Sequence, residues 1–225
     1  MTAQSFMRLV FSALICLTVF SFASGPAFAV SDSMVAEFER ADWDARILTD
    51  QGIARFRTDP QFQELLSMVN NPGIDWGIRI KGIKLMGAMG TDRAATHLVD
   101  MMNDPFFNHE CPSIKSYVAA ALGNYRGDSS VVTALINGTK DRELLVREAS
   151  VRSLGMIGDR RAVPAVIEAL KDESDAVRLR AISALGRIGD PQAVPYLRGI
   201  ADGPGDRVIK EQAAGALQEI SGAGR

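Results

Sequence analysis

The chain has 225 residues, of which 47% are hydrophobic and 23% are charged, and its formal net charge is −2. This hydrophobic content excludes a disordered chain, and the length is enough for a sizeable core, in one domain or in a short repeat array. The near balance of charge gives no sign of a nucleic-acid partner.

Residues 1–29 have the pattern of a secretory signal peptide. Arg8 supplies a positive charge, residues 9–22 are almost wholly apolar, and Ala27 and Ala29 place small side chains where a signal peptidase cleaves. An uncleaved anchor is the alternative, but this apolar run of about 14 residues is shorter than the roughly 20 that a spanning helix needs. We therefore expect cleavage after Ala29, a periplasmic or secreted protein, and no membrane span once the signal is removed.

The mature protein is expected to contain a single thiol. Cys16 leaves with the signal and Cys111 remains, so no internal disulfide can form. Loss of Arg8 takes the 25 basic side chains to 24, against 27 acidic ones, which is a balance of −3. Without an internal disulfide, the stability of the mature protein must come from packing.

Residues 30–74 are expected to form an N-terminal helical capping unit. Residues 34–56 indicate one helical stretch, and Thr58-Asp59-Pro60 followed by apolar residues indicates a corner and a further helix. Terminal units of a repeat array meet water on one face, so they depart from the repeat pattern. Trp43 and Trp76 flank this unit and are expected to pack between it and the first full repeat, although an exposed aromatic surface is a second interpretation.

Residues 75–221 repeat themselves. The segment VREASVRSLGMIGDRRAVPAVIEAL begins at Val146 and VRLRAISALGRIGDPQAVPYLRGIA begins at Val177, an offset of 31 residues. Apolar or small residues at offsets 0, 4, 7, 8 and 11 mark one face of an α-helix, and a second apolar segment follows, so each unit predicts one helical hairpin. The offset-0 position, called the anchor below, recurs at Ile78, Ile114, Val146, Val177 and Ile209.

An aspartate recurs at the corner between the two predicted helices of each unit. Its carboxylate can accept backbone N–H bonds at the start of the second helix. These corner caps are Asp59, Asp92, Asp128, Asp159 and Asp190. The last helix, 207–220, has no second helix after it and is expected to act as a polar lid.

The residues LG.IGD and AVP at 154–164, and again at 185–195, resemble the phycobilisome-lyase (PBS lyase) type of HEAT-like repeat. The resemblance is close for 146–221 and looser for 75–145. It implies an all-α, armadillo-like fold: a right-handed α–α superhelix of about five to six helical hairpins, with 75–221 as HEAT-like repeats and 222–225 as a flexible tail. The glycine pairs Gly155/Gly158 and Gly186/Gly189 then belong to helix ends and close helix contacts rather than to a nucleotide loop.

A basic residue directly follows every anchor, at Arg79, Lys115, Arg147, Arg178 and Lys210. One interpretation is a cationic stripe for an acidic partner. The favoured one is a structural basic ladder, because acidic residues precede several of the anchors at Asp75, Asp141, Asp175 and Asp206. Exposed pairs of this kind contribute only about 0 to 1 kcal/mol each.

Residues 103–113 interrupt the period. The interval from Asp92 to Asp128 is 36 residues, against 31 for the next two intervals. The extra residues fall in a loop whose candidate partner-binding residues are Phe106, Phe107, His109 and Cys111. Such a loop is suited to docking. The alternative, that both phenylalanines fold back to cover a gap between repeats, stays open.

No catalytic constellation, metal site or cofactor is predicted. Deoxyhypusine hydroxylase, a HEAT-like enzyme, uses paired His-Glu dipeptides to hold two irons, whereas this chain has only His109-Glu110, and His97 is its only other histidine. A phycobilin-lyase-like subunit is a second enzyme alternative, against which the signal peptide counts. We expect a non-enzymatic protein–protein interaction scaffold with an unidentified protein partner. A purely structural module of an envelope assembly is the third possibility.

Overall fold

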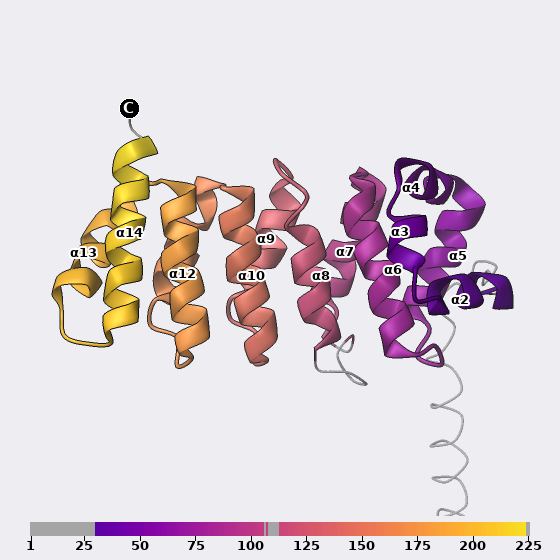
Figure 1. Ribbon diagram of the computed structural model, residues 1–225, viewed down its shortest axis with the longest axis horizontal. Coiled ribbons are helices and arrows are strands. Elements are labelled where there is room, and N and C mark those ends of the chain that lie inside the picture. The colour runs from indigo at the N-terminus through magenta and orange to yellow at the C-terminus, as the bar shows by residue number, and fades with distance from the viewer. Residues whose placement is uncertain (1–29, 106, 108–112, 224–225) are drawn as a thin grey trace, which may run out of the picture.

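The computed structural model describes residues 30–105, 107 and 113–223, so the predicted signal peptide and Phe106, His109 and Cys111 lie outside the described residues. Every regular element in these residues is a helix. Figure 1 shows an α–α solenoid in which consecutive hairpins stand side by side along the long axis. The resemblance predicted this architecture, and it is confirmed.

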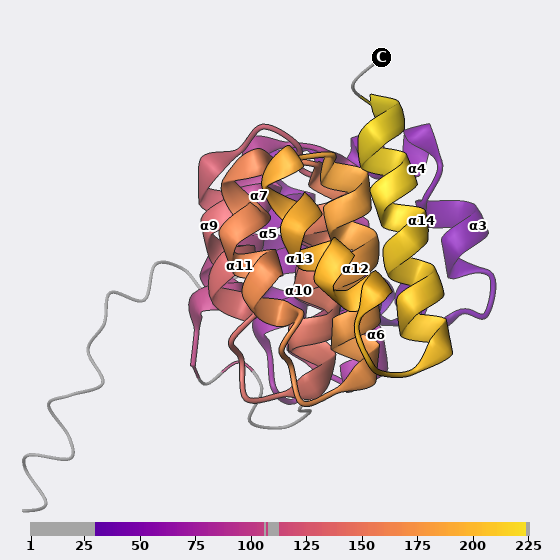
Figure 2. The ribbon, with the colours of Figure 1, turned by 90° about the vertical axis from the view of Figure 1, so that its left-hand side faces the viewer.

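Two layers of helices make up the stack, as the end-on view in Figure 2 shows. The A layer holds the first helix of each unit: α6 (Trp76–Met89), α8 (Ile114–Leu122), α10 (Leu144–Ile157), α12 (Asp175–Ile188) and α14 (Arg207–Ala223). The B layer holds the second helix of each unit: α7 (Asp92–Asn103), α9 (Ser129–Gly138), α11 (Val163–Ala169) and α13 (Val194–Asp202). Short 3-10 turns, η1 (Arg160–Ala162) and η2 (Pro191–Ala193), precede α11 and α13.

The core runs continuously between the two layers because each hairpin covers its neighbour's apolar face. Four of the anchors, Ile78, Ile114, Val146 and Val177, are buried, whereas Ile209 in the terminal helix is half-buried. The apolar periodicity therefore located the buried face of the A helices correctly.

Glycine brings neighbouring A helices close together. A Cβ on Gly155 would lie 2.7 Å from the Ala184 Cα of the next unit, and a Cβ on Gly87 would lie 2.8 Å from the Ala121 Cβ. Equivalent close approaches join Gly123 to Ser153 and Gly186 to Ala216. Gly158 instead ends α10 in the left-handed conformation, with φ 76°, as its place in the repeat predicted.

The predicted corner caps form at three of the five positions. Asp128, Asp159 and Asp190 hold the N-cap position, and each carboxylate accepts a backbone N–H bond two residues on. The prediction is wrong for Asp59 and Asp92, which lie inside the first turns of α5 (Asp59–Asn70) and α7. The residue with extended backbone that precedes each of these helices is the one before the aspartate, so Thr58 and Thr91 hold the N-cap positions.

The capping unit consists of α2 (Asp32–Glu39), α3 (Trp43–Ile47), α4 (Asp50–Phe56) and α5. Phe38 stacks on Trp43 with ring centroids 6.0 Å apart and meets Phe56 edge-on at 5.9 Å. Lys81 of α6 donates to the Phe38 carbonyl at 2.6 Å and lies over the Trp43 ring. These contacts attach the unit to the first repeat.

The two tryptophans differ. Trp43 is buried as predicted, but Trp76 is 56% exposed, so the expectation that it packs against the capping unit is wrong. Trp76 is the first residue of α6, where the side chain leaves the core because the buried face begins only at Ile78.

The terminal helix α14 closes the stack against α12 and α13. Ala213, Ala216 and Ile220 are buried, and Gln218 and Glu219 face solvent, as expected of a polar lid. Among the residues that the structure describes, no helix has the length and apolar character needed to cross a membrane.

Candidate functional site

The basic ladder is a buried network rather than a row of exposed pairs. The side chains of Arg79, Lys115 and Arg147 are almost inaccessible to solvent, which corrects the expectation of exposed charges. Arg79 Nε donates to the Val69 carbonyl at 2.8 Å. These side chains are buried because each follows an anchor that packs into the core. For Lys115 and Arg147, oxygen atoms of the loops beside the helix lie within reach of the cation.

The middle of the ladder runs without interruption across three units. Lys115 Nζ lies 3.4 Å from Asp141 Oδ2, and the Asp141 carbonyl accepts from Arg147 Nη1 at 3.1 Å. Arg147 Nε and Nη2 then donate to the two oxygens of Asp172 at 2.8 and 3.0 Å. The Asp172 carbonyl accepts from Arg178 Nη1 at 2.7 Å. Each loop is therefore held by cations from two consecutive A helices.

Electrostatics within the ladder match this geometry. The hydrogen bonds from Arg147 lower the pKa of Asp172, and the same bonds raise the pKa of the Arg147 guanidinium. Sequence reasoning missed Asp172, because it assigned the acidic role to residues that precede several of the anchors. Of those, Asp75 and Asp206 cap the starts of α6 and α14 instead.

The ends of the ladder differ from its middle. Arg178 is half-buried and pairs with Asp175 on its own helix. Lys210 is half-buried, and no ion pair joins it to another residue within the described ranges. The cationic stripe that an acidic partner would need is therefore not formed by these five residues, because three of them are buried.

The segment that interrupts the period lies between α7 and α8, and residues 106 and 108–112 within it are outside the described residues. Of its four candidate residues the structure describes only Phe107, which is half-buried with its ring centroid 5.7 Å from the Arg79 guanidinium. Phe107 thus folds back onto α6, as the gap-covering alternative predicted for it. The roles of Phe106, His109 and Cys111 stay predictions.

Exposed apolar side chains recur in the first turns of alternate A helices. Trp76, Leu145 and Val208 are 56%, 46% and 54% exposed, and each lies in the first turn of an A helix. Leu144 beside Leu145 is exposed as well. We call Trp76, Leu144, Leu145 and Val208 the apolar edge. The A helices begin on the same side of the stack, so the first turns that hold these residues lie along one border, with α8 and α12 between them.

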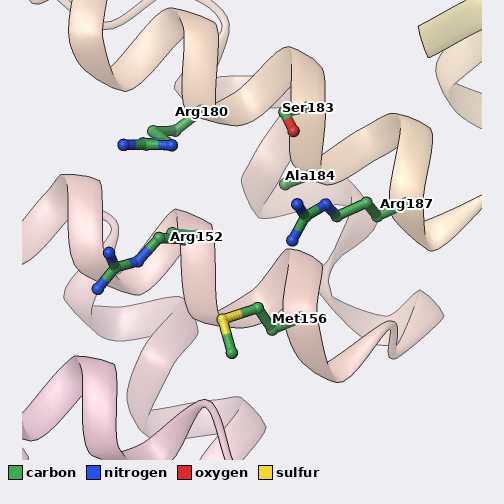
Figure 3. Close-up of a pocket in the computed structure, with 6 residues that line it drawn as sticks. All are labelled: Arg152, Met156, Arg180, Ser183, Ala184 and Arg187. Atoms are coloured by element: carbon green, nitrogen blue, oxygen red, sulfur yellow. The ribbon is translucent and has the colours of Figure 1, made fainter.

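A shallow groove lies between α10 and α12 on the solvent-facing side of the A layer. Figure 3 shows Arg152 and Met156 of α10 facing Arg180, Ser183, Ala184 and Arg187 of α12 across a hollow of about 80 Å³. We call these six residues the arginine groove. The repeat pattern alone does not indicate this groove. A partial signal is present, since Arg152 stands where one other unit carries Ala120, although α6 carries Lys84 there.

No group of three or more His, Cys, Asp or Glu side chains that could hold a metal ion occurs in residues 30–105, 107 and 113–223. His97 packs against Phe62 with ring centroids 5.6 Å apart, and burial lowers its pKa. His97 is half-buried at the border of the core.

Comparison with known proteins agrees with this architecture. Residues 105–165 and 132–218 match the model of HEAT repeats. The chain belongs to the HEAT repeat family. No curated protein sequence matches this HEAT repeat protein.

Solved structures similar to this HEAT repeat protein are also helical repeat proteins. A designed armadillo repeat protein in complex with the peptide (KR)4 is 13% identical, with a TM-score of 0.59, over 87% of this chain and all of that one. Computationally designed armadillo repeat proteins for modular peptide recognition are 12% identical, with a TM-score of 0.51, covering 83% and 98%. The CpcE–CpcF complex of phycocyanin lyase from Nostoc sp. PCC7120 is 18% identical, with a TM-score of 0.49, covering 89% and 80%.

Proposed function

We propose that this HEAT repeat protein is a non-enzymatic protein–protein interaction scaffold that works in the periplasm or the secreted space. The observation that carries the proposal is the apolar edge. Large apolar side chains that stay exposed at intervals along one border offer an extended partner a series of apolar contacts. A stack whose units are joined by buried ion pairs and close glycine packing holds that border rigid, which lowers the entropic cost of docking.

The repeat fold supports the proposal in general terms. Stacked units present long surfaces to partners, and the similar designed armadillo proteins are made for peptide recognition. The proposed location rests on the signal peptide pattern of residues 1–29. Expression of the full chain and mass measurement of the secreted form test it, and the expected mature protein begins at Val30.

Capture of a partner by residues 30–225, with chemical cross-linking and mass spectrometry, tests the scaffold. The variant Trp76→Gln/Leu145→Gln removes apolar area from the edge. Its matched control, Tyr196→Gln, removes an exposed aromatic from α13 in the other layer. We expect one stoichiometric partner with the unchanged protein and with the control, and its loss with the edge variant. A further variant lacking residues 104–112 measures the contribution of the loop.

Two results would contradict the scaffold. If no protein is captured by any form, the apolar edge has no partner under the conditions of the native compartment. If the purified protein carries a visible absorbance band from a bound pigment, the lyase-like alternative is favoured instead. In either case far-UV circular dichroism must show that every variant keeps its helical content.

A further inference from the structure

The arginine groove brings three guanidinium groups to one exposed hollow. Arg152 comes from α10, and Arg180 and Arg187 come from α12. The helices approach closely here because Gly155 meets the Ala184 backbone, so the floor is made of small residues and the long side chains stand at its rim. The groove is therefore a product of the packing between two units.

The cations in the groove are incompletely neutralised. Arg180 Nε donates to Glu148 Oε1 at 2.9 Å. Neither Arg152 nor Arg187 forms an ion pair with any residue in the described part of the chain. Each guanidinium has five N–H donors in a planar fork that matches a carboxylate. Two such forks at one hollow leave a local excess of positive charge on a protein whose overall charge is negative.

The size of the hollow limits what it can take. About 80 Å³ accommodates a carboxylate-bearing side chain, whereas pockets for whole small molecules measure roughly 300 to 1,000 Å³. The thioether of Met156 is exposed beside the guanidinium groups and adds an adaptable apolar contact. A nucleic acid would need a longer basic surface, and Glu148 and Glu219 border this one.

We infer that the arginine groove binds a carboxylate side chain of an acidic, extended segment in a partner protein, with an apolar residue next to it. The inference rests on the proposed scaffold function and gives that function a second contact surface of stated chemistry. Arg187, whose guanidinium points into the hollow, would receive the carboxylate, while Arg152 adds positive charge from the Arg180 end of the groove and Arg180 is positioned by Glu148. The apolar edge and the groove then bind different features of the partner.

The probe is a fluorescein-labelled, N-acetylated peptide of about ten residues, in which glutamate alternates with alanine around a central leucine. A second peptide with glutamine in place of glutamate serves as its control. Fluorescence anisotropy measures both peptides with residues 30–225, with Arg152→Gln/Arg187→Gln, and with Arg126→Gln/Arg198→Gln. The last variant removes the same charge at two other exposed arginines.

We expect the unchanged protein and the Arg126/Arg198 variant to bind the glutamate peptide alike. The Arg152/Arg187 variant should bind at least about tenfold more weakly, since charge-assisted hydrogen bonds are among the stronger ones. Equal binding by both variants, or equal binding of the glutamine peptide, overturns the inference. So does displacement of the peptide by equimolar inorganic phosphate or duplex DNA, or a signal explained by self-association in sedimentation.

The failure of the groove and the failure of the scaffold can be told apart. The peptide assay needs no natural partner and therefore reports on the groove alone. If a captured partner binds the Arg152/Arg187 variant as well as the unchanged protein, the groove inference is overturned while the scaffold stands. Thermal unfolding of both double variants checks the fold, which exposed arginines on a helix surface should not affect.

Discussion

Replacement of Gly155 by alanine tests whether close glycine packing sets the spacing of the A layer. The added Cβ would lie 2.7 Å from both the Cα and the Cβ of Ala184, whereas carbon atoms pack best at about 3.5 to 4.0 Å. No rotamer change relieves a clash with a backbone atom, so α10 and α12 would have to move apart by about 1 Å. Overpacking of this kind costs about 1 to 3 kcal/mol. Alanine returns up to ~1 kcal/mol through helix propensity, leaving a net destabilisation of about 0 to 2 kcal/mol.

The matched control is Gly215→Ala in α14, where nothing lies within 4 Å of the added Cβ. Only the propensity gain acts there, so this variant should be about 0.5 to 1 kcal/mol more stable than the unchanged protein. Urea unfolding of residues 30–225, followed by far-UV circular dichroism, measures both changes. If Gly155→Ala proves as stable as Gly215→Ala, the reasoning about helix spacing is refuted. A double variant with Ala184→Gly should recover only part of the loss, because the backbone of α12 still lies too close to the added methyl group.

Three further predictions concern buried or half-buried polar groups. Asp172→Asn leaves the buried Arg147 without its bidentate partner and should cost about 2 to 3 kcal/mol in the free energy of unfolding, measured by urea at pH 7. Because the pKa of Asp172 is lowered in the folded state, the carboxylate stabilises the fold above its unfolded pKa of about 4, and this stabilisation is lost on further acidification. Between about pH 4 and pH 2, Asp172→Asn should therefore lose less stability than the unchanged protein. Burial also lowers the pKa of His97, so as the pH falls the unfolded state takes up a proton before the folded state does, and the free energy of unfolding should fall as the pH drops through about 6.5. His97→Gln should flatten that part of the pH profile of urea unfolding. An unchanged slope would show that His97 does not cause it. Tyr125→Phe removes the hydroxyl that donates to the Met86 carbonyl and should cost about 1 kcal/mol, and ultraviolet titration should lose a phenol whose pKa burial raises to about 12.

The sequence predicted those features that depend on a single helix. The anchors Ile114, Val146 and Val177 are buried because a 3.6-residue apolar period reports directly on the buried face. Asp128 and Asp159 cap because an N-cap bond spans only two or three residues. Local spacing contains all the information that such features need.

Features that join two units were harder to predict. Arg147 reaches Asp172 across 25 residues, a pairing fixed by the register between hairpins rather than by spacing within one. The arginine groove likewise needs the relative placement of α10 and α12. Trp76 was misassigned because the first turn of a helix can face either the core or water, and the apolar character of a side chain does not distinguish the two.

The ladder also determines how the array can change in length. Asp172 lies in the loop that introduces α12, yet it neutralises Arg147 of the unit before, so the smallest exchangeable segment is not a hairpin with its own loops. Removal of the 31 residues from Val146 to Ala176 would place Arg178 directly after the loop that contains Asp141. Arg178 would then take the position of Arg147 beside the Asp141 carbonyl, and each loop oxygen would still face a cation. A cut out of that register would leave a buried guanidinium without a partner. Duplication and loss of units are thereby confined to steps of one whole period.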